Sequence, residues 1–299
     1  MAALVPGFAI LEHLGRGAGS HIFRAKDLNT GKEVSLKRVL RRSAEDDKYL
    51  AQTEHEYEIA RHLDHPNLRR CLEIRRVPGG DAPRELLLVM ELVCGETLER
   101  RRPVDSLQAV DIFTGLTRGL GALHATGLIH CDLKPRNVLL GTGDQVVIID
   151  FGQACPIGTV KERVQGTPDF LAPEQVRLDR LDERTDLFAL GATMYWALTG
   201  HGLVTPMPAR GGDPWPRTEG RLLHWSGPAS PAELNEAIPG ELSDLVMWAC
   251  QERPSDRPAA TDQLIDRLDE VRRICQPDPR APKSSDPPTD DSSRLAKST

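Results

Sequence analysis

The sequence lacks any pair of cysteines in the C-x-x-C spacing that is typical of structural zinc sites and thiol redox motifs. Its six cysteines are scattered along the chain instead. Neither a zinc site nor a disulfide framework is therefore indicated, and we expect reduced thiols, most of them buried. They are Cys71, Cys94, Cys131, Cys155, Cys250 and Cys275.

The chain also lacks an apolar run long enough to span a bilayer, which needs about 20 consecutive apolar residues. Its first residues, MAALVPGF, have neither the basic start nor the long apolar middle of a signal peptide. No internal repeat occurs at the periods that solenoid proteins use. We therefore predict no membrane span and a cytoplasmic location.

An overall basic charge is absent as well. The 38 Lys and Arg residues against 44 Asp and Glu residues give a formal net charge of −6. Without a basic field to gather phosphates, nucleic acid is not expected as the main partner. The composition, 39% hydrophobic over 299 residues, is sufficient for a sizeable core in one large domain or two lobes.

Two carboxylates flank a short hairpin in the middle of the chain. The apolar runs 138–140 and 146–149 enclose a Gly-Thr-Gly-Asp turn, which predicts two buried strands. Asp132 precedes the first strand and Asp150 follows the second, so the hairpin brings both to one edge, with Asn137 between them. Carboxylate and amide oxygens suit a hard divalent cation that accompanies nucleotide phosphates.

The motifs around these residues resemble those of eukaryotic-type protein kinases. Residues 130–137, HCDLKPRN, resemble the catalytic loop, and residues 150–152, DFG, resemble the metal-binding turn. Residues 166–174, GTPDFLAPE, resemble the end of the activation segment in serine/threonine kinases. A lone DFG tripeptide is a weak signal, whereas the loop and the turn at this spacing are a strong one. The resemblance covers residues 8–273, nearly all of the expected folded part.

The resemblance implies an α+β, bilobal protein-kinase-like fold, with a small antiparallel β lobe plus one helix and a larger, mainly helical lobe. We place a β-rich nucleotide-binding lobe at residues 1–93 and a helical catalytic lobe at residues 94–275. Residues 276–299 are rich in Pro, Ser, Asp and Lys with almost no apolar residues. Such a segment cannot bury enough surface to offset the entropy of ordering, so we predict a disordered tail.

The periodicity of the sequence agrees with this organisation. Residues 9–39 alternate apolar and polar side chains around two glycine-containing turns, which predicts three antiparallel strands. Asp105 and Gln108 are spaced as the capping box of a long helix. Helices are expected at residues 45–63, 105–126 and 241–250, a strand at 86–90, and a long irregular connection at 200–240, which is dense in Pro, Gly and Trp.

The glycine-containing turn at residues 15–19 predicts phosphate binding, because glycines let backbone N–H groups approach phosphates without a Cβ in the way. The strand at 34–37, VSLK, resembles the VAIK strand whose lysine holds the α and β phosphates of ATP. Ser20 and Ser35 depart from the family, which has glycine and alanine there. The resemblance implies these ATP-binding residues: Leu14, Gly15, Gly17, Ser20, Ile22, Ser35, Lys37, Met90, Glu91, Val93 and Leu139.

By the same resemblance, each part of phosphoryl transfer has a candidate residue. Asp132 would orient the substrate hydroxyl and accept its proton, and Lys134 would lie against the γ phosphate. Asn137 and Asp150 would hold Mg²⁺, or Mn²⁺ in its place.

The resemblance also implies a helical glutamate that fixes the ammonium group of Lys37. Glu54, Glu56 and Glu58 are the candidates on the expected helix at 45–63. Counting back from the His-Pro-Asn sequence at 65–67, as in the family, selects Glu56. The other acids are interpreted as solvated charges on the helix surface.

Two further motifs imply structural roles. Residues 186–191 resemble the buried central helix of the large lobe, in which Asp186 ties down the backbone of the catalytic loop. Arg257 resembles the arginine that pairs with the glutamate of the A-P-E motif, here Glu174.

Two alternatives differ from an active protein kinase. A pseudokinase that binds ATP as a scaffold, with little or no catalysis, would have lost the lysine, the base or the metal ligands, and all are present. A small-molecule kinase of the aminoglycoside or choline type shares the catalytic loop but lacks the counterparts of Glu174 and Arg257. We therefore predict an ATP-dependent serine/threonine protein kinase that acts on protein substrates, whose identity the sequence does not give.

Cys131 stands where many protein kinases carry an arginine just before the catalytic aspartate. In those relatives the arginine binds a phosphate on the activation segment and orders it. Cysteine cannot do so, and between residues 152 and 166 Thr159 is the only hydroxyl. A basic side chain such as Arg163 would supply fixed charge from within the segment. We predict activity without phosphorylation of the activation segment, the alternative being that Thr159 is still the switch.

Overall fold

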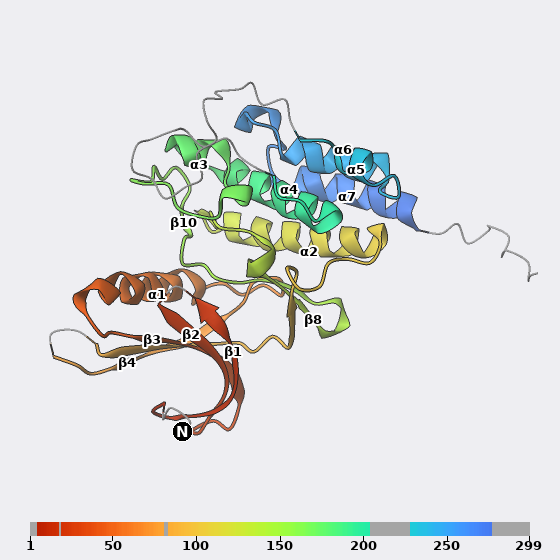
Figure 1. The fold of residues 1–299 in the computed structure, drawn as a ribbon. Coiled ribbons are helices and arrows are strands. Elements are labelled where there is room, and N and C mark those ends of the chain that lie inside the picture. Colours follow the sequence, from red (N-terminus) through yellow and green to blue (C-terminus); the bar gives the residue numbers. More distant parts are fainter. Residues whose placement is uncertain (1–4, 18, 81–82, 204–227, 277–299) are drawn as a thin grey trace, which may run out of the picture.

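The computed structural model describes residues 5–17, 19–80, 83–203 and 228–276. The N-terminal part is a five-stranded sheet in the order β1-β2-β3-β5-β4, accompanied by one helix. The C-terminal part is mainly helical and lies against one end of this sheet (Figure 1). The predicted α+β, bilobal arrangement is therefore present. Most of the predicted tail, from residue 277 on, lies outside the described residues, as does 204–227 of the predicted irregular connection.

The sheet is antiparallel throughout, and the three strands predicted within residues 9–39 are confirmed. Strand β5 is buried along its whole length. Leu87 and Val89 enter one apolar cluster, while Leu86 enters another with Leu50 of the helix. A strand covered on both faces explains the unbroken apolar run in its sequence. The strands are β1 Phe8–Gly17, β2 Ser20–Asp27, β3 Glu33–Leu40, β4 Cys71–Val77 and β5 Glu85–Met90.

Helix α1, Asp47–Ala60, follows a short 3-10 turn at Ala44–Asp46. It ends three residues before the predicted boundary, because the chain turns at residues 61–62 toward His65, whose position before Pro66 disfavours helix. Leu63 is nevertheless buried in the main core. The sequence pattern correctly predicted that Leu63 is buried, but wrongly predicted that it is part of the helix.

The predicted central hairpin is present in the larger lobe. Strand β8, Val138–Gly141, pairs antiparallel with β9, Val146–Ile148, and Val138 lies opposite Ile148. Gly143 in the turn has a φ of 66°, which glycine adopts without strain. The remaining strands are β6 Gly95–Thr97, which pairs with β8, and β7 Leu128–Ile129, which pairs with β10 Cys155–Pro156.

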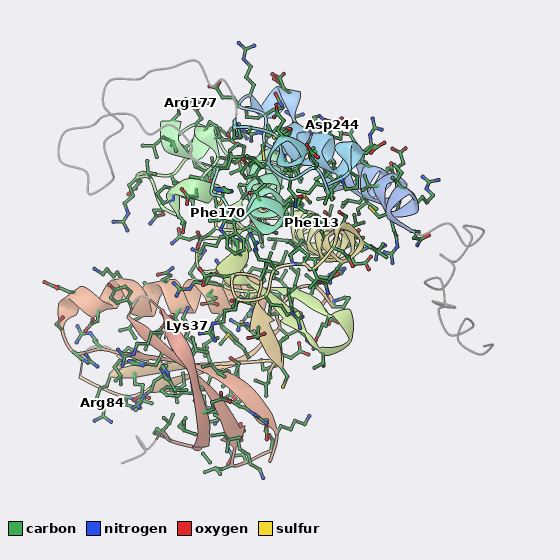
Figure 2. The ribbon with its side chains drawn as sticks, turned by 45° about the vertical axis from the view of Figure 1, so that its right-hand side comes forward. Lys37, Arg84, Phe113, Phe170, Arg177 and Asp244 are labelled. Carbon is green, nitrogen blue, oxygen red and sulfur yellow. The ribbon has the colours of Figure 1, made fainter. Side chains whose placement is uncertain are left out.

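The helices of the larger lobe pack around α2 and α4, with Phe113 among the side chains inside this lobe (Figure 2). The side chain of Asp105 accepts the N–H of Gln108 at 2.8 Å, as predicted. The Gln108 side chain accepts the N–H of Val104 instead of that of Asp105, so the capping box is displaced by one residue. The helices are α2 Ser106–His124, α3 Pro173–Arg177, α4 Glu183–Thr199, α5 Pro231–Leu234, α6 Gly240–Ala249 and α7 Thr261–Cys275.

A buried ion pair connects α3 to the loop before α7. The guanidinium of Arg257 donates to both carboxylate oxygens of Glu174, at 2.7 and 2.9 Å. Its side chain is 0% exposed and also donates to three backbone carbonyls. The predicted Glu174–Arg257 pair is confirmed. Across the described ranges, no helix combines the length and the apolar character that crossing a membrane requires.

Candidate active site

One face of the sheet in the small lobe carries four of the eleven residues predicted to bind nucleotide. Ser35 and Lys37 are two apart on β3 and therefore point to the same side. Ile22 lies opposite Lys37, and Met90 lies opposite Ser35. Directly opposite residues of antiparallel strands share a face. The structure thus brings these four side chains together, and Figure 2 shows Lys37 near the junction with the helical lobe.

The glycine-containing turn is packed against helix α1. Gly15 pairs with Ile22, and Gly17 pairs with Ser20. Gly19 has a φ of +67°, and a Cβ there would lie 2.3 Å from the ring of Tyr49. Glycine is therefore required at this position. Ser20 is not among the described residues with positive φ, so serine in place of the family's glycine causes no backbone strain.

The other predicted nucleotide contacts come from both lobes. Leu14 is half exposed on β1, and Leu139 lies on β8, opposite Thr97. Glu91 and Val93 follow β5 directly. The N–H of Glu91 donates to the carbonyl of Arg70 at 3.0 Å. The carbonyl of Glu91 and the backbone of Val93 are the groups that would face the edge of a purine.

Lys37 and Glu56 form a buried ion pair, with Nζ 2.6 Å from Oε2. The Glu56 side chain is only 1% exposed, although it lies on a helix. Burial lowers the pKa of Lys37, but the carboxylates of Glu56 and Asp150 outweigh it and raise that pKa above its ordinary value. The lysine is therefore held as a cation beside Glu56 and Asp150.

The other two candidate acids of α1 bind elsewhere. Glu54 accepts a hydrogen bond from Arg76 at 2.8 Å, and Glu58 lies 3.4 Å from Arg61. Both carboxylates are exposed to solvent. The count from the His-Pro-Asn sequence thus selected the one glutamate that contacts Lys37.

Asp132 is held by two neighbours on the catalytic loop. The ammonium of Lys134 lies 2.8 and 3.0 Å from its two carboxylate oxygens and 3.2 Å from the hydroxyl of Thr167. The side-chain amide of Asn137 donates to the backbone carbonyl of Asp132 at 2.8 Å and to its carboxylate at 3.2 Å. These contacts fix the position of the carboxylate that the sequence nominates as the base. Thr167 was not nominated, although it lies within the G-T-P motif.

Asp186, on α4, holds the backbone of the same loop through hydrogen bonds. Its carboxylate accepts the N–H groups of His130 and Cys131, at 2.7 and 2.8 Å, and lies 2.8 Å from a ring nitrogen of His124. Burial raises the pKa of Asp186, but the bond and charge of His124 outweigh it and keep that pKa below its usual value. The role predicted for Asp186 is confirmed, whereas nothing in the local sequence pointed to His124.

Asp150 and Asn137 are the oxygen donors available for a cation. Burial raises the pKa of Asp150, but the charge of Lys37 and then that of His130 lower it below its usual range, so the carboxylate is ionised. Because the nitrogen of Asn137 is bound to Asp132, its oxygen is the atom that can contact a metal. Within the described ranges, no three His, Cys, Asp or Glu side chains form a metal cluster. This donor set fits Mg²⁺ that shares its ligands with phosphates and water.

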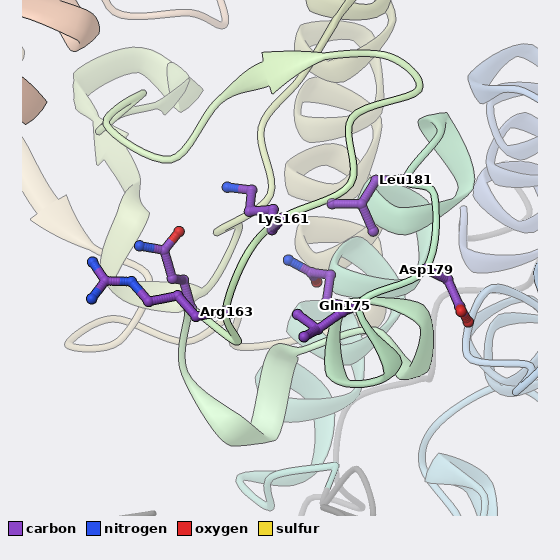
Figure 3. Close-up of a pocket in the computed structure, with 7 residues that line it drawn as sticks. Lys161, Arg163, Gln175, Asp179 and Leu181 are labelled. Carbon is purple, nitrogen blue, oxygen red and sulfur yellow. The ribbon is translucent and has the colours of Figure 1, made fainter.

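The activation segment is anchored by contacts that need no phosphate. Strand β10 pairs with β7, and Lys161 donates to the carbonyl of Gln153 at 2.8 Å. Helix α1 contributes His55, a ring nitrogen of which lies 2.7 Å from the carbonyl of Ala154. Arg163, which the sequence had suggested as the internal cation, is exposed. With the Gln165 amide in the orientation that satisfies its hydrogen bonds, Arg163 donates to its oxygen at 3.3 Å. Both basic residues therefore make contacts within the segment, and Figure 3 shows them on it.

Comparisons with known proteins agree with this geometry. Residues 8–267 match the family described as the protein kinase domain. The chain is 28% identical over 91% of its length to the serine/threonine-protein kinase pkn3 of Myxococcus xanthus, and 29% identical over 91% to PknB of Mycobacterium tuberculosis. The crystal structure of the PknI kinase domain of M. tuberculosis matches 90% of this chain and 97% of its own, with a TM-score of 0.65 at 22% identity. That likeness is evidence for the fold.

The relatives are longer proteins. The match covers 52% of pkn3 and 44% of PknB, so the chain spans about half the length of these relatives or less.

Proposed function

The chain belongs to the protein kinase family, and from this premise we propose that it transfers the γ-phosphate of ATP to serine and threonine hydroxyls of protein substrates. The observation that carries the proposal is the buried Lys37–Glu56 ion pair at 2.6 Å, because phosphoryl transfer requires the lysine to be fixed where it can position the α and β phosphates. The names of the relatives, serine/threonine-protein kinases, support this hydroxyl class.

The proposed mechanism depends on positioning and charge, since phosphoryl transfer needs little covalent chemistry from the protein. Lys37 binds the α and β phosphates, and Glu56 holds its ammonium in place. Asp150 and Asn137 are the residues that would hold Mg²⁺, which when bound neutralises phosphate charge. Leu14, Ile22 and Leu139 would contact the adenine ring, with Met90 behind it.

Asp132 orients the substrate hydroxyl and accepts its proton. In the structure its carboxylate is paired with Lys134, so the ammonium lies where a γ phosphate next to the hydroxyl would need a counter-charge. The hydroxyl of Thr167 helps to hold Lys134 there. The activation segment thereby contributes to the placement of the base.

The function is tested by incubating the full chain with labelled ATP, Mg²⁺ and a generic basic protein, followed by phosphoamino acid analysis. We expect phosphoserine or phosphothreonine in the protein substrate. Label that stays in ATP, or that passes only to phosphotyrosine, would overturn the proposal.

ATP should stabilise the protein only when Mg²⁺ or Mn²⁺ is present, because the ionised Asp150 repels bare phosphates. At ATP concentrations of about 100 times Kd, the gain in the free energy of unfolding should be about 2.7 kcal/mol. Thermal unfolding with ATP, with and without the metal, measures this. Equal shifts of the unfolding temperature in both conditions would rule out Asp150 and Asn137 as ligands of the metal. In Asp150→Asn the difference between the two conditions should shrink.

Thr159→Ala should change the rate of phosphoryl transfer by less than about tenfold, or about 1.4 kcal/mol of barrier. The Thr159 hydroxyl donates to the carbonyl of Pro156 at 2.6 Å within its own turn, and the segment is anchored by Lys161 without a phosphate. Mass spectrometry should confirm that the assayed segment is unmodified. A larger loss would make Thr159 the switch after all.

A further inference from the structure

Two cysteines that have no part in the proposed chemistry are in contact with each other. Cys131 is on the catalytic loop, and Cys155 is on the activation segment. The sulfurs of Cys131 and Cys155 are 3.5 Å apart. Both side chains are buried, at 2% and 8% exposure, in a small apolar cluster with Ile129 and Leu181. Among the described residues, no other pair of cysteine sulfurs is in contact.

The backbone, and not the thiols, brings the two sulfurs together. Cys155 pairs with Ile129 across the β7–β10 ladder, so Cys131 lies two residues beyond that pairing. Cys131 has a φ of +62°, which turns the chain out of the strand. Its N–H is held by Asp186 at 2.8 Å and its carbonyl accepts from Gln175 at 3.0 Å. A strained conformation held from outside in this way is preserved when the thiols react.

The sulfurs are close enough to bond. A disulfide has an S–S distance of about 2.05 Å, so the two atoms must approach by about 1.5 Å. One sulfur is on a short strand that pairs through only two residues, Cys155 and Pro156. A movement of this size is within reach of side-chain rotation together with a small shift of that strand.

The two thiols differ in reactivity. The hydrogen bond from Cys131 lowers the pKa of the Cys155 thiol, burial opposes this, and the charge of Lys161 lowers that pKa further. The hydrogen bond to Cys155 and burial raise the pKa of Cys131. Cys155 is therefore the better thiolate and the more exposed of the pair. By contrast, burial raises the pKa of Cys71 to about 12.

We propose that Cys131 and Cys155 are a modification site that a peroxide oxidises to a reversible disulfide, which slows phosphoryl transfer. The Cys155 thiolate attacks one oxygen of hydrogen peroxide, the O–O bond breaks, and the products are a sulfenic acid and hydroxide. The sulfur of Cys131 then attacks the Cys155 sulfur, its proton leaves with the released oxygen, and water is formed. In total, two thiols and one peroxide give one disulfide and two waters.

The effect on rate follows from the movement of β10, because the backbone of Cys131 is held in place. A shift of β10 displaces the activation segment, whose Thr167 lies 3.2 Å from the ammonium of Lys134 beside Asp132. A misplacement of about 1 Å can cost about 10²-fold in rate. This second half of the inference rests on the proposed function. The formation of the disulfide does not.

The reduced full chain is treated with one equivalent of hydrogen peroxide, capped with an alkylating reagent and digested. We expect a peptide in which Cys131 and Cys155 are linked, and dithiothreitol should restore both free thiols. Oxidation of Cys155 to sulfinic acid without a link, or full alkylation of both cysteines, would overturn the site.

Kinase assays on the same samples test the regulatory half. We expect oxidation to slow the wild type at least tenfold and Cys94→Ser equally, because Cys94 is an exposed thiol outside the pair. Cys155→Ser should retain its rate in peroxide. If the linked protein keeps the rate of the reduced protein, the regulatory effect is wrong. If the link forms but the reduced protein transfers no phosphate, the proposed function fails and the disulfide stands.

Discussion

Replacing Asp132 by asparagine should lower the rate of phosphoryl transfer by about 10²–10⁴-fold, the range that a general base contributes. The amide has nearly the same shape and can keep the contact of its backbone carbonyl with Asn137, which is 2.8 Å long. It cannot accept the proton of the substrate hydroxyl, and it no longer compensates the charge of Lys134. The loss should therefore appear in kcat more than in the KM for ATP.

The matched control is Asp64→Asn, which makes the same chemical change at a carboxylate that is 84% exposed. It should leave the rate within about twofold, since surface substitutions away from a special feature are nearly neutral. Thermal unfolding of both variants separates chemistry from folding. A near wild-type rate for a folded Asp132→Asn protein would remove Asp132 as the base.

Replacing Arg257 by alanine should reduce the free energy of unfolding by about 3–5 kcal/mol, because it leaves Glu174 buried without its partner. The pair is bidentate, and the exposed fractions of its side chains are 0% and 4%. The guanidinium also lies 4.9 Å from the ring centroid of Phe188. Denaturant unfolding of the variant and the wild type, with the slope compared as well as the midpoint, measures the difference.

The exposed pair of Arg267 and Glu270, at 2.9 Å on α7, provides the control. Arg267→Ala should cost less than about 1 kcal/mol, since exposed ion pairs contribute little. The double variant Glu174→Gln/Arg257→Met should recover part of the loss, because it leaves no unpaired charge. An Arg257→Ala variant as stable as the Arg267→Ala variant would contradict the interpretation of this pair as structural.

Much of this site could be predicted from the sequence because its residues are grouped in short motifs. Spacing within one hairpin fixes where Asp150 and Asn137 lie, and counting along one helix separates Glu56 from Glu54 and Glu58. Glu56 illustrates why the count succeeds: the residue is on the buried side of α1, at 1% exposure, where only a glutamate with a cationic partner is tolerated.

The contacts that could not be predicted join segments far apart in the chain. His124 approaches Asp186 across 62 positions, and Gln175 reaches the carbonyl of Cys131 across 44. Neither residue belongs to a local pattern that indicates its partner. The left-handed backbone conformation of Cys131 could not be predicted either, because cysteine has no preference for that conformation. The three-dimensional packing imposes it.

Asp186 also determines how the molecule can move. Its ionised carboxylate is 0% exposed and is compensated by two N–H groups of the catalytic loop and by His124. Opening that loop alone would leave the buried charge with His124 as its one remaining hydrogen-bond partner, at a cost of several kcal/mol. The loop and α4 therefore form one cooperative unit that opens only when the lobe unfolds. Any opening of the site must therefore come from other segments. In the small lobe, Gly19 lies against the ring of Tyr49, and such a contact between uncharged groups separates at lower cost.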